Sequence, residues 1–192
     1  MCSDARLRGL FDAVRTVEDR KIPGDIVECG TARGGSLVLM GLALHLFGGQ
    51  RCLWAFDTFE GLPPPTPEDP DEKIARAYTG LCRGEIDQVT ALLKEHRLDS
   101  CTNLVKGLFQ ETLSHTNTGP IAVLHLDGDW YASLKVCLEQ LYDRVSPGGI
   151  IQIDDYGHWQ GAKKVVDEFF YSRSMKVVLK KLDYTGRQFT KY

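Results

Sequence analysis

The sequence predicts a doubly wound α/β fold, in which helices cover both faces of a mainly parallel sheet. Two observations indicate it. Short apolar runs of strand length alternate along the chain with longer segments of helical period. The apolar runs are also continuous, as in Ile121 to Leu124, which is typical of strands that are covered on both faces. The 192 residues suffice for one domain with a substantial core.

The N-terminal part begins with an amphipathic helix and continues with two strands. Apolar residues recur at helical spacing over residues 4–20, and IPGD at 22–25 ends that helix. The run at 25–30 reads as a short buried strand that ends in glycine. A tight loop then leads into a helix at 36–47, and a second strand follows at 51–57.

The middle of the chain adds a loop, two helices and two strands. Residues 61–72 hold five of the eight prolines, which predicts a loop over the surface. A weaker helical pattern covers 85–97. Strands are expected at 102–107 and 120–127, and a helix at 131–143.

The C-terminal part completes the predicted sheet. SPGG at 146–149 indicates a turn into a strand at 150–155. A helix follows at 161–171. Two terminal strands, at 175–181 and 186–192, bring the predicted total to seven.

The composition argues against two classes of partner. The net charge is −3 and no basic block occurs, whereas nucleic-acid binding requires clustered Lys and Arg. Residues 1–14 lack the apolar core of a signal peptide, and the run from Leu37 to Phe47 is too short to span a bilayer. The six cysteines form no C-x-x-C pair, so we interpret them as ordinary residues of a reducing cytosol. We expect a cytoplasmic protein with neither nucleic acid nor membrane as partner.

Acidic residues end, or directly follow, four of the predicted strands. They are Glu28, Asp57, Asp127 and the pair Asp154 and Asp155. In an open α/β sheet, ligands bind at the carboxyl ends of the strands. One aspartate at such a place more often caps a helix or a turn, but four acidic strand ends in one sheet favour a ligand site.

The glycine-rich loop ECGTARGGS, from Glu28 to Ser36, lies between a predicted strand and a helix. Glycines there allow a ligand to approach the backbone and the helix N-terminus. The loop lacks the second glycine of the dinucleotide fingerprint, because Ala32 takes its place. Asp57 matches the acidic residue that hydrogen-bonds a ribose diol. Together these features suggest an adenosine-type ligand without a bound pyrophosphate. The alternative is that the glycine loop is only a tight turn between a strand and a helix.

Asp127, Asp129, Asp154 and Asp155 form a second group. The strands that end near 127 and 155 are expected to be neighbours, so the carboxylates would converge. Like charges that close repel unless a cation lies among them or one of them is protonated. Carboxylate oxygens favour Mg²⁺ or a similar ion. The alternative is that Asp154 and Asp155 cap the following turn.

Several motifs together resemble the macrocin O-methyltransferase family, which includes sugar O-methyltransferases of macrolide and novobiocin biosynthesis. The motifs are PGDIVECGTARGGS, FDTFEGLP, LHLDGDWYASLKVCLEQLYDRVSPGGIIQIDDY and DYTGRQFTKY, and the resemblance extends from about Ile22 to Tyr192. It implies the class I S-adenosylmethionine (SAM) methyltransferase fold, Rossmann-like, with seven strands of which the last is antiparallel. It also implies Mg²⁺-assisted methyl transfer from SAM to a sugar hydroxyl.

The resemblance assigns roles to particular residues. It implies that Asp127, Asp154 and Asp155 are the metal ligands and that Asp129 is the candidate general base. We hypothesise that Asp127 anchors the cation that holds the acceptor, and that Asp129 receives the proton of the acceptor hydroxyl or orients that hydroxyl. His158 is a rival base. The implied SAM-site residues are Glu28, Gly30, Arg33, Ser36, Asp57, Thr58, Gly107 and Phe109.

The expected organisation is one methyltransferase domain over 1–192, with an N-terminal helix and linker at 1–24 and a lid or acceptor loop at 61–84. The expected partner is a small-molecule or glycoside acceptor, and a homodimer is compatible with the resemblance. Trp159 is a candidate acceptor contact, whereas His125, inside a strand, is expected to serve the core.

Two other functions stay open at this point. A metal-dependent glycosyltransferase would use DGD at 127–129 as its D-x-D motif, but would leave the glycine loop without a role. A non-catalytic module would keep the fold alone, at the expense of burying unused charges.

Overall fold

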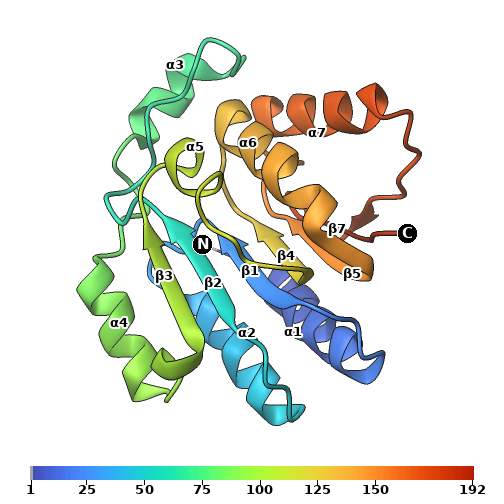
Figure 1. Ribbon diagram of the computed structural model, residues 1–192. Helices are drawn as coiled ribbons and strands as arrows, with labels where there is room; N and C mark the ends of the chain where they lie inside the picture. The colour runs from blue at the N-terminus through green and yellow to red at the C-terminus, as the bar shows by residue number, and fades with distance from the viewer. Residues whose placement is uncertain (1) are drawn as a thin grey trace.

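The computed structural model describes residues 2–192 and contains a seven-stranded sheet with helices on both faces (Figure 1). The strand order is β3-β2-β1-β4-β5-β7-β6. Strands β1 to β5 pair in parallel, and β7 runs antiparallel between β5 and β6. The predicted class I fold with an antiparallel last strand is thereby confirmed. The strands are β1 Asp25–Cys29, β2 Leu53–Asp57, β3 Thr102–Lys106, β4 Ile121–Leu126, β5 Val145–Ile153, β6 Lys180–Lys181 and β7 Arg187–Thr190.

Two hydrophobic clusters occupy the two faces of the sheet. One cluster joins α1, α2 and α4 to the sheet, and the other joins α6 and α7 to its opposite face. Neighbouring residues of β1 show the alternation, since Ile26 belongs to the first cluster and Val27 to the second. The helices are α1 Asp4–Asp19, α2 Gly35–Leu46, α3 Glu72–Ala75, α4 Ile86–Glu95, α5 Phe109–Thr112, α6 Tyr131–Leu141 and α7 Gln160–Ser172.

Helix α1 has the predicted position and a defined start. Ser3 is its N-cap, and the Ser3 hydroxyl accepts a hydrogen bond from the Arg6 backbone N–H at 3.3 Å. Leu10, Val14 and Val17 are fully buried at spacings that place them on one helix face. The N-terminus of α1 therefore has a fixed place, and the site described below uses it.

The segment SPGG does not form the predicted separate turn. Strand β5 already begins at Val145, and its register with β4 shifts between Ile121 and Val123. Gly148 has a φ of 84°, and its N–H donates to the Lys191 carbonyl at 2.7 Å. The glycine therefore permits an irregularity within the sheet where a break was predicted.

The predicted strand at 175–181 is reduced to the two residues of β6. Met175, Val177 and Leu179 pack against the core, whereas Val178 is 87% exposed. The alternating apolar pattern is thus satisfied by one-sided packing, without a ladder of strand hydrogen bonds. Alternation alone does not distinguish these two arrangements.

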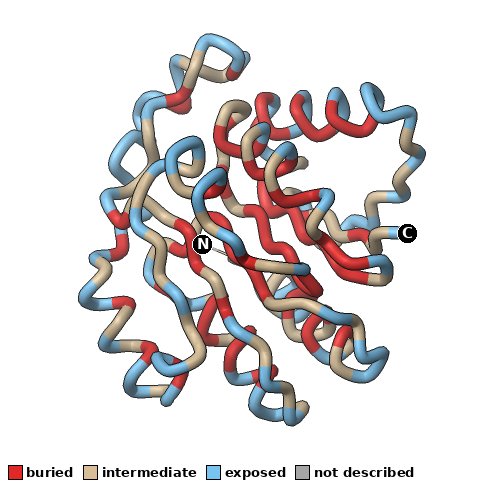
Figure 2. The backbone as a smooth tube through the Cα atoms, in the orientation of Figure 1, coloured by how far each residue is buried: buried red, intermediate tan, exposed pale blue. Residues whose placement is uncertain are grey.

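The central strands are buried along their length, whereas most of the loop at 61–84 is exposed (Figure 2). Every residue of β4 is buried. No helix within residues 2–192 is both long enough and apolar enough to cross a membrane.

Candidate active site

The glycine loop after β1 packs directly on the chain that follows β4. Gly30 has a φ of 93°, and its N–H donates to the Phe56 carbonyl at 2.9 Å. A Cβ at this position would overlap the carbonyl oxygen of Asp127. Only glycine fits, because both the positive φ and the close approach exclude a side chain. The glycine loop is therefore in direct contact with the segment after β4 that carries the acidic residues.

The Asp57 carboxylate, at the end of β2, holds the glycine loop through the backbone. Its Oδ2 accepts hydrogen bonds from the N–H groups of Thr31 at 2.7 Å and Ala32 at 2.8 Å. Its Oδ1 accepts from the Phe59 N–H at 2.7 Å. Ala32 is held at a φ of 45°, in the left-handed region. Asp57 thus has a structural task, and its predicted contact with a ribose stays a prediction.

Further predicted SAM-site residues lie around the same sheet edge. The Gly107 N–H donates to the Asp57 carbonyl at 3.0 Å, and the Thr58 hydroxyl donates to the Gly61 carbonyl at 2.8 Å. Phe109 begins α5. Arg33 is exposed in the glycine loop, and Ser36 lies in the first turn of α2.

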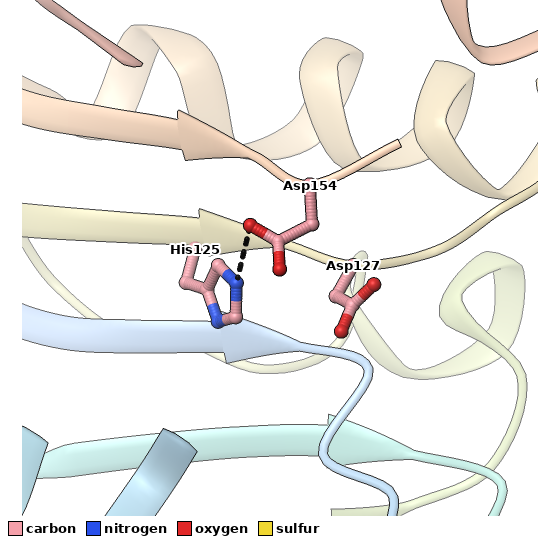
Figure 3. Close-up of side chains that lie close together, drawn as sticks. All are labelled: His125, Asp127 and Asp154. Carbon is pink, nitrogen blue, oxygen red and sulfur yellow. Dashed lines mark ion pairs between the residues drawn. The ribbon is translucent and has the colours of Figure 1, made fainter. Parts of the chain in front are cut away.

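Glu28 is placed differently from the other predicted SAM-site residues, inside the sheet. Its side chain is fully buried, and Oε1 lies 2.9 Å from Nδ1 of His125 on the neighbouring β4. Nε2 of His125 lies 3.2 Å from Oδ1 of Asp154 (Figure 3). His125 is buried as expected, but it joins two carboxylates where an ordinary core contact was predicted.

Both oxygens of Asp154 have partners. Oδ1 accepts from Gln152 Nε2 at 2.9 Å, and Oδ2 accepts from an Arg6 guanidinium nitrogen at 3.0 Å and from the Cys2 thiol at 3.3 Å. Burial would raise the pKa of Asp154, but His125, Gln152 and Arg6 hold it below its ordinary value. Burial likewise opposes the charged form of His125, yet Asp154 and Glu28 raise its pKa well above the usual range.

Asp127, Asp129 and Asp155 form an acidic cluster in which one oxygen from each residue lies within 4.8 Å of the others. Burial and the charges of Asp154 and Asp129 raise the pKa of Asp127 to about 8. Burial and the neighbouring aspartates also raise the pKa of Asp155. Carboxylates this close demand a cation or protons between them, so the donor set fits a divalent cation.

Asp127 belongs to two groups of possible metal ligands. The first contains His125, Asp127 and Asp154, and the second contains Asp127, Asp129 and Asp155. Asp127 thus lies near each of the other two predicted ligands, Asp154 and Asp155, but neither group contains all three, so their joint binding of a cation stays a prediction. His125 is an added member that the sequence did not indicate.

Trp159 orients the predicted base. Its indole N–H donates to Asp129 Oδ1 at 2.9 Å, while the Asp129 backbone N–H donates to Asp155 Oδ2 at 3.0 Å. Burial raises the pKa of Asp129 to about 6, although the bond from Trp159 opposes the rise. His158 is exposed, and its ring contacts Trp159 edge-on at 4.6 Å between centroids. Its role as a rival base is untested.

The loop at 61–84 is anchored to the two helices beside the acidic cluster. Asp69 Oδ1 accepts from the Tyr131 N–H at the start of α6 at 2.8 Å, and Asp71 Oδ2 accepts from the Gln160 N–H at the start of α7 at 3.1 Å. The Trp130 indole N–H donates to the Pro63 carbonyl at 2.7 Å. These anchors were not predicted, because their partners lie more than sixty residues away in sequence.

Comparison with known proteins gives a consistent assignment. The family model described as macrocin-O-methyltransferase (TylF) matches residues 1–191. A tetracenomycin-C rhamnosyl 4'-O-methyltransferase from Streptomyces olivaceus is 38% identical over 156 residues, which are 79% of this chain and 60% of that protein. The demethyldecarbamoylnovobiocin O-methyltransferase from Streptomyces niveus is 34% identical over 170 residues, which are 85% of this chain and 64% of that one. The chain thus spans less than two thirds of the length of either relative.

Solved structures agree with the fold. The O-methyltransferase NovP superimposes with a TM-score of 0.89 at 29% identity, and the match covers 97% of this chain and 79% of that one. The calicheamicin methyltransferase CalS11 superimposes with a TM-score of 0.79 at 22% identity, covering 96% of this chain and 78% of that one.

Proposed function

This chain belongs to the macrocin-O-methyltransferase (TylF) family, and we propose that it transfers the methyl group of SAM to a hydroxyl group on the sugar of a natural product or glycan. The observation that carries the proposal is the direct contact at Gly30, where the glycine loop packs on the carbonyl of Asp127. A methyl donor bound along that loop lies beside the carboxylates that would hold the acceptor. Transfer of a methyl group requires this adjacency, because the two reacting atoms must align for in-line displacement.

The donor would bind on the β1 and β2 side. There the backbone of the glycine loop is open to close approach, and Asp57 keeps the loop in place. The proposed SAM contacts remain those inferred from the sequence, namely Glu28, Gly30, Arg33, Ser36, Asp57, Thr58, Gly107 and Phe109. Glu28 would contribute to the SAM site from inside the sheet, since its side chain is fully buried.

The acceptor hydroxyl would be activated on the β4 and β5 side. Asp127, Asp154 and Asp155 would hold a divalent cation, which supplies Lewis acidity toward the hydroxyl when it is bound. Asp129 would take the hydroxyl proton, and Trp159 holds its Oδ1 in place. A carboxylate whose pKa is raised to about 6 suits this task, because a general base works best when its pKa lies near the working pH.

Two relatives support a sugar-bearing natural product as the class of acceptor, since one is a rhamnosyl-tetracenomycin methyltransferase and another is a mycinamicin III 3''-O-methyltransferase. The loop at 61–84, anchored over α6 and α7, would form part of the acceptor wall. A homodimer and a cytoplasmic location remain predictions from the sequence.

Calorimetric titration with S-adenosylhomocysteine, with and without Mg²⁺, tests the proposal. We expect binding in both conditions, because the glycine loop and Asp57 need no cation to keep their arrangement. A screen of sugars and glycosides for methyl transfer from SAM would follow. Absence of binding in both conditions, together with binding of a UDP- or GDP-sugar, would contradict the proposal and favour the glycosyltransferase.

A further inference from the structure

Four aromatic side chains form a row of ring contacts beside the acidic cluster. Tyr78, in the loop at 61–84, contacts Trp159 edge-on at 5.3 Å between ring centroids. The His158 ring lies 4.6 Å from the Trp159 ring and 6.2 Å from the Tyr184 ring, again between centroids. The row therefore joins the loop, the start of α7 and the segment between β6 and β7.

One member of the row lies at the proposed reaction centre. Trp159 is 7% exposed, and its indole N–H donates to Oδ1 of Asp129, the proposed base, at 2.9 Å. The rings beyond Trp159 are open to solvent, since His158 is exposed and Tyr184 is 68% exposed. These two rings therefore lie where a group attached to the methylated sugar can reach them.

The backbone holds Tyr184 in place although its side chain is exposed. The Gly157 N–H donates to the Thr185 carbonyl at 2.9 Å, and a Cβ on Gly157 would overlap the Tyr184 carbonyl oxygen. Asp183 Oδ1 accepts a hydrogen bond from the Gly186 N–H at 2.6 Å. Because its backbone is already ordered, Tyr184 can bind a ligand at a small cost in conformational entropy.

The row has the composition of a ligand-binding wall. Exposed apolar side chains that occur singly need no explanation, but contiguous ones mark sites of interaction. Pockets for small molecules combine aromatic walls with a few polar groups that fix the orientation of the ligand. Here the rings continue outward from a residue that is hydrogen-bonded to the proposed base, so they extend the acceptor site.

The charges at the row disfavour an acceptor that carries phosphate. The acidic cluster lies at its inner end, through Asp129. Arg6 and Arg187, which contact the segment between β6 and β7, are engaged there by Asp183 and by the Gly186 carbonyl. A diphosphate bound along the row would be repelled by the carboxylates. An uncharged group meets no such penalty.

We propose that His158 and Tyr184 form a subsite for an apolar aglycone, so that the acceptor is a complete, uncharged glycoside. The inference rests on the proposed function for the place of the acceptor hydroxyl, and it deepens that function by naming the class of acceptor. It also places the methyl transfer after the glycosyl-transfer reaction that joins the sugar to its aglycone.

Calorimetric titration of the full chain with two rhamnosides, in the presence of S-adenosylhomocysteine and Mg²⁺, tests the subsite. Rhamnose is the sugar that the relative from Streptomyces olivaceus is named for. We expect 4-nitrophenyl α-L-rhamnoside to bind at least about tenfold more tightly than methyl α-L-rhamnoside, because its ring buries apolar surface on the subsite. Equal affinities, no binding of the aryl glycoside, or tighter binding of TDP-rhamnose would overturn the proposal.

Three variants locate the preference for the aryl glycoside. Tyr184→Ala and His158→Ala should each reduce it to less than about threefold, so the result does not depend on the folding of one variant. Tyr171→Ala is the matched control and should keep the preference, because Tyr171 is also largely exposed but lies near the end of α7, outside the row. An unchanged preference in both Tyr184→Ala and His158→Ala would overturn the proposal.

The same measurements separate this inference from the proposed function. Binding of S-adenosylhomocysteine together with equal methylation of both rhamnosides would keep the methyl transfer and reject the subsite. Failure of S-adenosylhomocysteine to bind would contradict the methyl transfer, whereas a preference for the aryl glycoside that depends on Tyr184 would still support the subsite.

Discussion

The carboxylates at the ends of β2 and β4 occupy equivalent places in the sheet but have opposite surroundings. Asp57, after β2, accepts three backbone N–H bonds, from Thr31, Ala32 and Phe59. Asp127, after β4, faces other carboxylates, and no donor to its side chain occurs within residues 2–192. Its pKa rises to about 8 through burial and those neighbours.

The difference shows that the hydrogen-bond donors around a strand-end aspartate, rather than its position in the fold, decide whether it holds a loop or is available for a ligand. The charge of Asp57 is satisfied by the protein itself, so the side chain can organise a loop before any ligand binds. The charge of Asp127 is unsatisfied until a cation or a proton arrives. One half of the site is therefore ready in advance, and the other half is completed on binding.

Removal of Asp127 should have the largest effect on activity. We expect Asp127→Ala to lower methyl transfer by about 10³-fold or more, because the cation and the acceptor lose their shared anchor. Affinity for S-adenosylhomocysteine should change by less than about threefold. Initial rates with an acceptor from the glycoside screen, beside calorimetry, measure both. Undiminished turnover would contradict the assignment.

Substitution of Gly30 disturbs the contact between the glycine loop and the segment that carries Asp127. We expect Gly30→Ala to destabilise folding by about 3 kcal/mol or more, since its Cβ would overlap the Asp127 carbonyl at a positive φ. Gly35→Ala is the matched control, because it lies in α2 with nothing within 4 Å of its added Cβ. Urea unfolding of both variants measures the difference. Equal stabilities would show that the loop adapts.

Asp57→Ala tests whether the donor half is organised in advance. Three backbone N–H groups lose their acceptor, so we expect a loss of about 2 kcal/mol in unfolding free energy. S-adenosylhomocysteine should bind about tenfold or more weakly. The thermal shift produced by a divalent cation alone should persist, whereas Asp127→Ala should abolish it. Loss of that shift in Asp57→Ala would show that the two halves are not independent.

The two aspartates that anchor the loop at 61–84 are partnered in the manner of Asp57. Asp69 is 4% exposed and Asp71 is more open to solvent. We expect Asp69→Ala to destabilise folding by about 1–2 kcal/mol and Asp71→Ala by about 0.5 kcal/mol, as for lost helix caps. Chemical denaturation measures both. The reverse order would mean that burial does not set the strength of these caps.

Asp183 offers a test through the pH dependence of stability. Burial would raise its pKa, but hydrogen bonds from Ser3 and Gly186 and the charge of Arg6 lower it from 3.8 to about 2. Its stabilisation is therefore present above pH 3.8 and is lost as the pH falls through about 2. Asp183→Asn should be less stable than the parent by about 1 kcal/mol at pH 6, with the gap closing in acid. A gap independent of pH would assign the effect to packing.

Much of the fold could be predicted from the local pattern of apolar and acidic residues in the sequence. Continuous apolar runs indicated buried parallel strands, and acidic residues after them indicated the functional edge. The predictions were weakest where the determining partner was distant or weakly specified. The run at 175–181 alternates like a strand, but only Lys180 and Lys181 pair with β7.

The gathering of acidic residues at one edge of the sheet was predicted, and the contacts of these residues were not. The convergence of Asp127 with Asp154 and Asp155 required only the order of neighbouring strands. The link from Glu28 through His125 to Asp154 required the register of three strands, in which Glu28 lies beside His125 and His125 beside Gln152. Arg6 was missed because nothing in an amphipathic helix indicates which of its cations will meet a carboxylate 148 residues away.

The two ends of the loop at 61–84 are hydrogen-bonded to each other, so the loop is a separate unit attached to the rest of the domain. The Leu62 N–H donates to the Leu81 carbonyl and the Gly80 N–H to the Leu62 carbonyl, both at 2.9 Å, so the chain leaves and re-enters the body at one point. A segment with a single junction can be exchanged for one of another length or composition while the sheet stays unchanged. Acceptor preference could thus diversify, or be engineered, by replacing one cassette, provided that carboxylates equivalent to Asp69 and Asp71 still fasten it to α6 and α7.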